Sequence, residues 1–152
     1  QHLSKGFEKG LVEWLSGCTC LDVTLADDGM AVASDTVFFA RPDRHLALLD
    51  DRTMRLFDSE PVNGHRPSAD HLFESAAEVF GPNAAGVILT GMGDDGARAL
   101  GRIRRAGGLT VAQDESTSTV YGMPKAAADL GTAERVLPLD LIPQCLIGWA
   151  RS

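Results

Sequence analysis

Apolar residues follow two different periods along the C-terminal two thirds of the chain. Between residues 68 and 80 they recur at helical spacing, and Ser68 or Pro67 is a suitable first residue for that helix. Residues 85–89 are a continuous apolar run of strand length, typical of a strand buried on both faces. Alternation of such strands and helices builds a parallel sheet covered by helices. The predicted elements are a helix over 68–80, a strand over 85–89, a helix over about 95–106, a strand over 109–112, a short helix opened by Pro124, a strand at 136–137 and a terminal helix over 139–149.

The first 60 residues show a different pattern. An apolar set at helical spacing predicts a helix over 6–17 that ends at a glycine. Short stretches rich in β-branched and aromatic residues follow, separated by polar turns, and they predict an antiparallel β patch. We therefore expect residues 1–152 to form one α/β domain, with a doubly wound, mostly parallel sheet flanked by helices and a small antiparallel β patch. The strands predicted for the patch are 21–25, 37–40, 45–49 and 54–57.

Composition and charge exclude several classes of protein. The chain has 152 residues and a formal net charge of −7, which argues against a nucleic-acid binder, since such proteins present a basic surface to phosphates. No apolar run reaches the length of a membrane span, and no signal peptide is recognisable, so we predict a cytoplasmic protein without membrane insertion. The cysteines at 18, 20 and 145 lack the spacing of a zinc site, and we predict neither a metal nor a cofactor.

A glycine-rich loop, residues 90–96, joins the predicted buried strand to the next helix. Its carboxylates at Asp94 and Asp95 have two interpretations. Both could cap helix N–H groups at a tight turn, or one could orient a histidine while a loop amide donates to an oxyanion. The loop lacks the Gly-Lys-Ser/Thr ending of a P-loop, and two aspartates would repel a phosphate.

Several blocks of the sequence resemble the chemotaxis receptor protein-glutamate methylesterases, and together they span nearly the whole chain. The segment 86–97, Gly-Val-Ile-Leu-Thr-Gly-Met-Gly-Asp-Asp-Gly-Ala, is similar to the signature of that family. The similarity continues in the same order through the other blocks, of which the N-terminal one is short. These blocks are 1–7, 41–46, 62–70, 110–116 and 120–127.

The resemblance implies a fold, an activity and roles for particular residues. Family members hydrolyse glutamate methyl esters, and deamidate glutamines, on methyl-accepting chemotaxis receptors by a Ser-His-Asp mechanism on a doubly wound α/β domain. By position, His2 is the general base, Asp95 orients it, and the amide of Met92 stabilises the oxyanion. Asp94 is expected to be a polar cap or rim residue. The expected substrate-binding residues are His65, Arg66, Tyr121, Gly122 and Met123, although a helix-entry role for the first two and a packed loop for the last three are equally compatible with the sequence.

The nucleophilic serine of the family has no counterpart in this sequence. None of the serines lies in a Gly-x-Ser-x-Gly turn, and Ser68 is expected to cap a helix. We therefore expect this chain to lack the first strand and the nucleophile turn, to be inactive as written, and to carry no receiver domain. A receiver domain could belong to the full-length protein. The open sheet edge that would result predicts a homodimer.

Two other functions fit the sequence. The chain could be a non-catalytic module that docks on receptors or on another protein of bacterial chemotaxis signalling. It could also be a small-ligand α/β domain that uses the loop 90–96, in which case His2 would be dispensable.

Overall fold

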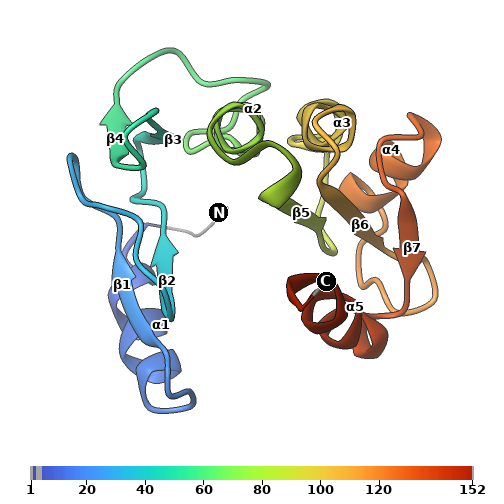
Figure 1. Ribbon diagram of the computed structural model, residues 1–152, viewed down its shortest axis with the longest axis horizontal. Helices are drawn as coiled ribbons and strands as arrows, with labels where there is room; N and C mark the ends of the chain where they lie inside the picture. The colour runs from blue at the N-terminus through green and yellow to red at the C-terminus, as the bar shows by residue number, and fades with distance from the viewer. Residues whose placement is uncertain (1, 3–4, 152) are drawn as a thin grey trace.

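A three-stranded parallel sheet forms the centre of the C-terminal half. The computed structural model describes residue 2 and residues 5–151. The strands lie in the order β5-β6-β7, with Ala85 opposite Leu109 and Val111 opposite Arg135. Helices α2, α3 and α4 lie on one face of the sheet and α5 on the other (Figure 1). The elements are α2 (Ala69–Phe80), η1 (Gly81–Asn83), β5 (Ala85–Ile88), α3 (Ala97–Arg105), β6 (Leu109–Gln113), α4 (Met123–Asp129), β7 (Arg135–Leu137), η2 (Leu139–Leu141) and α5 (Ile142–Ala150).

Close packing of α3 on β5 explains the glycine in the middle of that strand. A Cβ at Gly86 would lie 2.5 Å from Leu100 Cδ1 and 2.9 Å from Ile103 Cδ1, so any other residue would have to displace the ends of these two buried side chains. Leu100 and Ile103 are buried at this interface, together with Ile88. The sheet and its helices thus confirm the predicted doubly wound arrangement, and the predicted elements of this half are all present.

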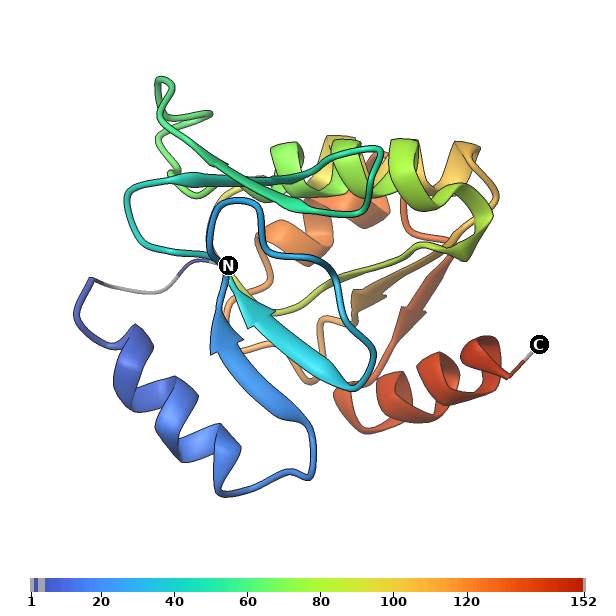
Figure 2. The same ribbon diagram turned by 60° about the vertical axis from the view of Figure 1, so that its left-hand side comes forward.

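The N-terminal half consists of a helix and two pairs of strands. Strand β1 pairs with β2, and β3 pairs with β4 as the predicted antiparallel hairpin, which packs on α2. Figure 2 shows the N-terminal helix on the outer side of the β1–β2 pair, away from the C-terminal half. No helix within residues 5–151 is both long enough and apolar enough to cross a bilayer. The elements are α1 (Glu8–Ser16), β1 (Asp22–Leu25), β2 (Thr36–Phe39), β3 (His45–Leu48) and β4 (Met54–Phe57).

The prediction that all four N-terminal strands are antiparallel was wrong for the first two. Strands β1 and β2 run parallel, with Val23 opposite Val37. The reason is the path of the connecting segment: Ala31 forms an antiparallel bridge with Thr53, and Met30 O accepts from the Met54 N–H. The polar turn after β1 therefore does not form a hairpin. The segment between β1 and β2 runs to the β3–β4 hairpin and returns, so that β2 starts at the same end as β1.

An apolar groove of about 710 Å³ separates β2 from β5. It is lined by residues of β2, α2 and β5, whose places in the fold are labelled in Figure 1. His2 and the loop after β5 also line it. The predicted burial of this run on both faces was wrong, because Gly86 and Ile88 are buried whereas Ala85 is exposed and Leu89 is 44% exposed. In the described part of the chain β5 is an edge strand. The apolar side chains of the walls include Phe38, Leu72, Phe73 and Ile88.

Candidate active site

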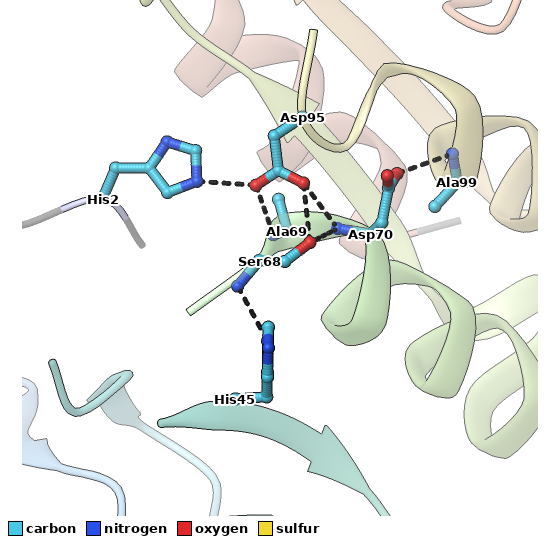
Figure 3. A network of polar contacts seen from close by, with 7 residues as sticks. All are labelled: His2, His45, Ser68, Ala69, Asp70, Asp95 and Ala99. Atoms are coloured by element: carbon cyan, nitrogen blue, oxygen red, sulfur yellow. Dashed lines mark hydrogen bonds and ion pairs between the residues drawn. The ribbon is translucent and has the colours of Figure 1, made fainter. Parts of the chain in front are cut away.

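Asp95 lies in the loop between β5 and α3, and its carboxylate points at the N-terminus of α2 (Figure 3). It is fully buried, with no exposed surface. Oδ2 accepts from the Ala69 N–H at 2.6 Å, and Oδ1 accepts from the Ser68 hydroxyl at 2.7 Å and from the Asp70 N–H at 3.3 Å. The first N–H groups of a helix have no partner within the helix, and the dipole there favours negative charge. Helix α2 therefore holds Asp95 in place as an anion.

Ser68 connects this carboxylate to a buried histidine, His45. It is the N-cap of α2, as predicted, and its Oγ also accepts from the Asp70 N–H at 3.2 Å. The Ser68 N–H donates to His45 Nδ1 at 3.2 Å, while His45 Nε2 donates to the Glu60 carbonyl at the same distance. This pair of contacts requires the Nε2-protonated neutral imidazole. Burial is the main cause that lowers the pKa of His45, and this favours the same form.

His2 completes a histidine–aspartate pair. Its Nε2 lies 2.6 Å from Asp95 Oδ2, and 26% of its side chain is exposed. A carboxylate without a proton can only accept, so Nε2 carries the hydrogen and the lone pair lies on Nδ1. The two residues are 93 positions apart, and the fold brings them together as expected. A histidine held in one tautomer by a buried carboxylate is the arrangement of a general base.

The pKa of Asp95 reflects competition between burial and hydrogen bonding. Burial in the protein would raise the pKa of this carboxyl group. Hydrogen bonds from His2, from the backbone of Ala69 and from the Ser68 hydroxyl stabilise the charged form and outweigh burial, and the pKa falls to about 2. Asp95 is consequently ionised at every pH at which a neutral histidine could act as a base.

His65 lies directly against His2. The two rings are stacked with centroids 4.3 Å apart and an interplanar angle of 10°. His65 closes a tight turn with Val62 and lines the groove. Its neighbour Arg66 is exposed, and its guanidinium donates to the Ser59 carbonyl at 2.9 Å. The structure therefore brings His65 to the predicted base and directs Arg66 toward another loop.

The loop that follows β5 is fastened to the loop before α4. Gly91 donates to the Val120 carbonyl at 3.0 Å, and its own carbonyl accepts from the Met123 N–H at 2.8 Å. A Cβ at Gly122 would lie 2.7 Å from Gly91 O, which explains the glycine at this position. Tyr121 forms a parallel bridge with Gly91. Of the residues predicted to contact substrate here, Met123 lines the groove, while Tyr121 and Gly122 form the contact between the loops.

Met92 lies at the rim of the groove, with 82% of its surface exposed. Asp94, two positions further along, is exposed, and its carbonyl accepts from the Ala97 N–H at the start of α3; it is not among the described residues that line the groove. Behind the loop, buried Gln113 accepts from the Thr90 N–H at 2.8 Å and donates to the Thr117 carbonyl. The sequence interpretation assigned no role in the site to His45 or Gln113, although both lie within family blocks, 41–46 and 110–116.

Three serines of the described chain have hydroxyls that are already hydrogen-bonded within the protein. Ser68 is fully buried and bound to Asp95, and Ser116 and Ser118 bond to Asp114. Among the described residues that line the groove, one carries a hydroxyl, Thr90, and this hydroxyl accepts from the Val120 N–H at 2.8 Å. The hydroxyls of these four described residues thus form hydrogen bonds with residues other than His2.

The fold and the site define an α/β domain with a histidine–aspartate pair at the carboxyl end of a parallel sheet, where such sheets place their active sites. The family model for the CheB methylesterase matches residues 1–146. The chain belongs to the CheB methylesterase family.

Individual relatives agree with this assignment. Protein-glutamate methylesterase FrzG of Myxococcus xanthus is 47% identical over 149 residues, which cover 98% of this chain and 45% of that protein. Protein-glutamate methylesterase/protein-glutamine glutaminase 2 of Anaeromyxobacter dehalogenans is 48% identical over 146 residues, 96% of this chain and 42% of that protein. The chain thus spans less than half the length of these relatives.

A solved structure has the same fold. The crystal structure of the Thermotoga maritima CheB methylesterase catalytic domain superimposes with a TM-score of 0.92 at 37% sequence identity. The match covers 97% of this chain and 80% of that domain. The family and the fold expected from the sequence are both confirmed.

Proposed function

We propose that this chain supplies the base and the oxyanion loop of a protein-glutamate methylesterase and glutamine deamidase that acts on methyl-accepting chemotaxis receptors. The observation that carries the proposal is the His2–Asp95 pair at the rim of an apolar groove. The names of the relatives, methylesterase and glutaminase, support both reactions. Both replace a substituent on a carboxyl carbon with water, so one site can serve an ester and an amide.

In the proposed mechanism, His2 acts through Nδ1. This nitrogen takes the proton from an attacking serine hydroxyl and returns it to the leaving methanol or ammonia. The resulting imidazolium donates through Nε2 to Asp95, whose ionised state stabilises the positive charge. The backbone amide of Met92, at the rim, is proposed to donate to the oxyanion. Water then repeats the sequence on the acyl-enzyme.

We place the serine on a segment that lies in the groove between β2 and β5. Both strands belong to parallel sheets, and the groove between them is walled by apolar side chains of β2, α2 and β5. A strand inserted there would join the two sheets and bury these side chains, which is favourable in proportion to the apolar area covered. Such a strand would end near His2. Its serine would then lie within reach of the proposed base, as a nucleophile must.

Substrate contacts are proposed at both sides of the groove. His65 and Met123 line it and would flank the ester group. Arg66, Tyr121 and Gly122 lie on the two bordering loops, and we propose that they meet parts of the receptor outside the groove. A receiver domain in the full-length protein would regulate access. We further propose that the 152-residue chain alone dimerises through its open strand edges and that the protein works in the cytoplasm.

The decisive experiment measures methanol release from methylated receptor. This chain is compared with a form extended upstream by about 30 to 40 residues, the size of one strand–turn–helix unit. Activity in the extended form alone, abolished by His2→Gln, supports the proposal. Activity in both forms would mean that a nucleophile lies within these 152 residues. Activity in neither would favour the non-catalytic docking module. Size-exclusion chromatography of the shorter form tests dimerisation, and a monomer would contradict it.

A further inference from the structure

Three side chains that bind metals in other proteins meet at the rim of the groove. His2, His65 and Asp95 each offer one ligand atom, and these atoms all lie within 4.8 Å of one another. We propose that they form a site for a divalent transition-metal ion of the Zn²⁺ type, and that the bound ion holds the active site in an inactive arrangement. The inhibitory role rests on the proposed function, whereas the binding site does not.

The ligand set selects the class of ion. Two imidazoles and one carboxylate with an open position for water are a typical three-ligand set for Zn²⁺. Calcium and magnesium prefer sites built from oxygen ligands, so this nitrogen-rich set disfavours them. The site is also accessible, because His2 is partly exposed and the groove opens beside it.

Asp95 is prepared to act as a ligand. Its carboxylate is ionised and is held by the Ser68 hydroxyl and by the amide of Ala69. An ion that replaces His2 as the partner of Oδ2 leaves these hydrogen bonds in place. Hydrogen-bonded support of this kind orients metal ligands and strengthens binding.

Metal binding by His2 would prevent this residue from acting as the proposed base. Ring nitrogens bind metals through lone pairs in the ring plane, and the planes of His2 and His65 are nearly parallel. Both can therefore bind one ion only after one ring turns. If His2 binds through Nε2, it loses the proton that it shares with Asp95. If it binds through Nδ1, it loses the lone pair that the base requires. Either mode blocks the proposed base.

Zinc binding by the full chain provides a test that is independent of activity. The exposed thiols of Cys18 and Cys20 and the partly buried Cys145 would compete for zinc, so the parent protein carries Cys→Ser at all three positions. Calorimetric titration with Zn²⁺ should show one site per chain. Because each substitution removes a ligand, His2→Gln and His65→Gln should each weaken binding by more than the roughly tenfold that loss of a supporting residue costs.

A matched histidine variant controls for unspecific binding. His71→Gln removes an imidazole of α2 that contacts His45 and Phe57, and zinc affinity should not change. His65 lies on a partly exposed turn, so His65→Gln should fold, and circular dichroism checks this. Absence of a one-to-one site in the parent, or unchanged affinity in folded His65→Gln, would overturn the proposal.

The inhibitory role is tested on a form that releases methanol. Zn²⁺ should lower its rate, EDTA should restore it, and the ratio of rates with and without Zn²⁺ should approach one in His65→Gln. This ratio is independent of any change in the basal rate. A ratio equal to that of the parent would overturn the regulatory role. If no form is active, the proposed function fails while the binding titration still decides whether the metal site exists.

Discussion

Asp70 and Asp95 each accept hydrogen bonds at the N-terminus of the other's helix (Figure 3). Asp95, just before α3, accepts from Ala69 and Asp70 of α2, and Asp70 accepts from the Ala99 N–H of α3 at 3.2 Å. The two helices thereby lock together at the ends that border the site. The position of the Asp95 carboxylate is thus set by the packing of α2 on α3 as much as by its own loop.

These reciprocal hydrogen bonds predict a strong effect of Asp95→Asn. An asparagine offers one acceptor oxygen and places an NH₂ group among N–H donors, so buried donors lose their partner. We expect the free energy of unfolding to fall by about 2 kcal/mol, measured by urea denaturation. In an active form the rate should fall by several orders of magnitude, on the order of 10⁴ for the equivalent change in serine proteases. Asp94→Asn, at an exposed position, should change stability by less than about 0.5 kcal/mol.

Asp70→Asn should be far milder than Asp95→Asn. Burial raises the pKa of Asp70, and the hydrogen bond from the Ala99 N–H opposes this without overcoming it. The ionised form of Asp70 is therefore destabilised in the folded protein. Asparagine keeps an oxygen for the Ala99 N–H and removes that charge. We expect stability at neutral pH to change by at most about 0.5 kcal/mol, whereas Asp70→Ala, which lacks the acceptor, should cost about 1 kcal/mol. Equal losses for Asp70→Asn and Asp95→Asn in the same urea experiment would contradict the difference in their pKa shifts.

Acid should remove the contribution of Asp95. Its pKa is about 2 in the folded protein and about 3.9 when unfolded, so the unfolded state binds a proton first as the pH falls. The stabilisation is therefore complete above about pH 5 and is lost as the pH falls toward 2, a change of about 2 kcal/mol. The stability difference between the parent and Asp95→Asn should narrow over this range in urea titrations. A difference that is constant from pH 6 to 2 would show that Asp95 is not held as an anion.

The sequence predicted the parts of this protein that depend on local pattern. Helical spacing and glycine stops located α2, β5, α3 and β6, and Ser68 was recognised as a cap because capping is a local property. The family blocks paired His2 with Asp95, and the structure places them 2.6 Å apart. The elements and the cap needed no knowledge of which distant segments meet, whereas the His2–Asp95 pair, 93 positions apart, came from the resemblance to the family.

Features that depend on distant contacts were not predictable in this way. The parallel pairing of β1 and β2 follows from the bridge between Ala31 and Thr53, and polar turn residues in between suggested a hairpin instead. The role of His45 depends on Ser68, 23 positions away, and on a carbonyl 15 positions away. Periodicity carries no information on such contacts.

The contact between the two loops of the site predicts a specific effect of Gly122→Ala. The new Cβ would lie 2.7 Å from Gly91 O, 3.1 Å from Gly93 N and 3.2 Å from Met92 Cα, all of them backbone atoms. The segment 91–93 must therefore move, and with it the proposed oxyanion amide of Met92. We expect a loss of about 1 to 3 kcal/mol in the free energy of unfolding. In an active form kcat should fall more than substrate affinity, because the displaced amide acts in the transition state.

Gly148→Ala is the matched control for this prediction. Gly148 lies in α5, and a Cβ there meets nothing within 4 Å. Alanine in a helix is favoured over glycine by roughly 0.5 to 1 kcal/mol, so this variant should be slightly more stable and equally active. The two variants make the same chemical change, and their opposite effects on the melting temperature isolate the contact with Gly91. If Gly122→Ala were as stable and as active as Gly148→Ala, the loops could separate without consequence, and the fixed position of the Met92 amide would lose its structural basis.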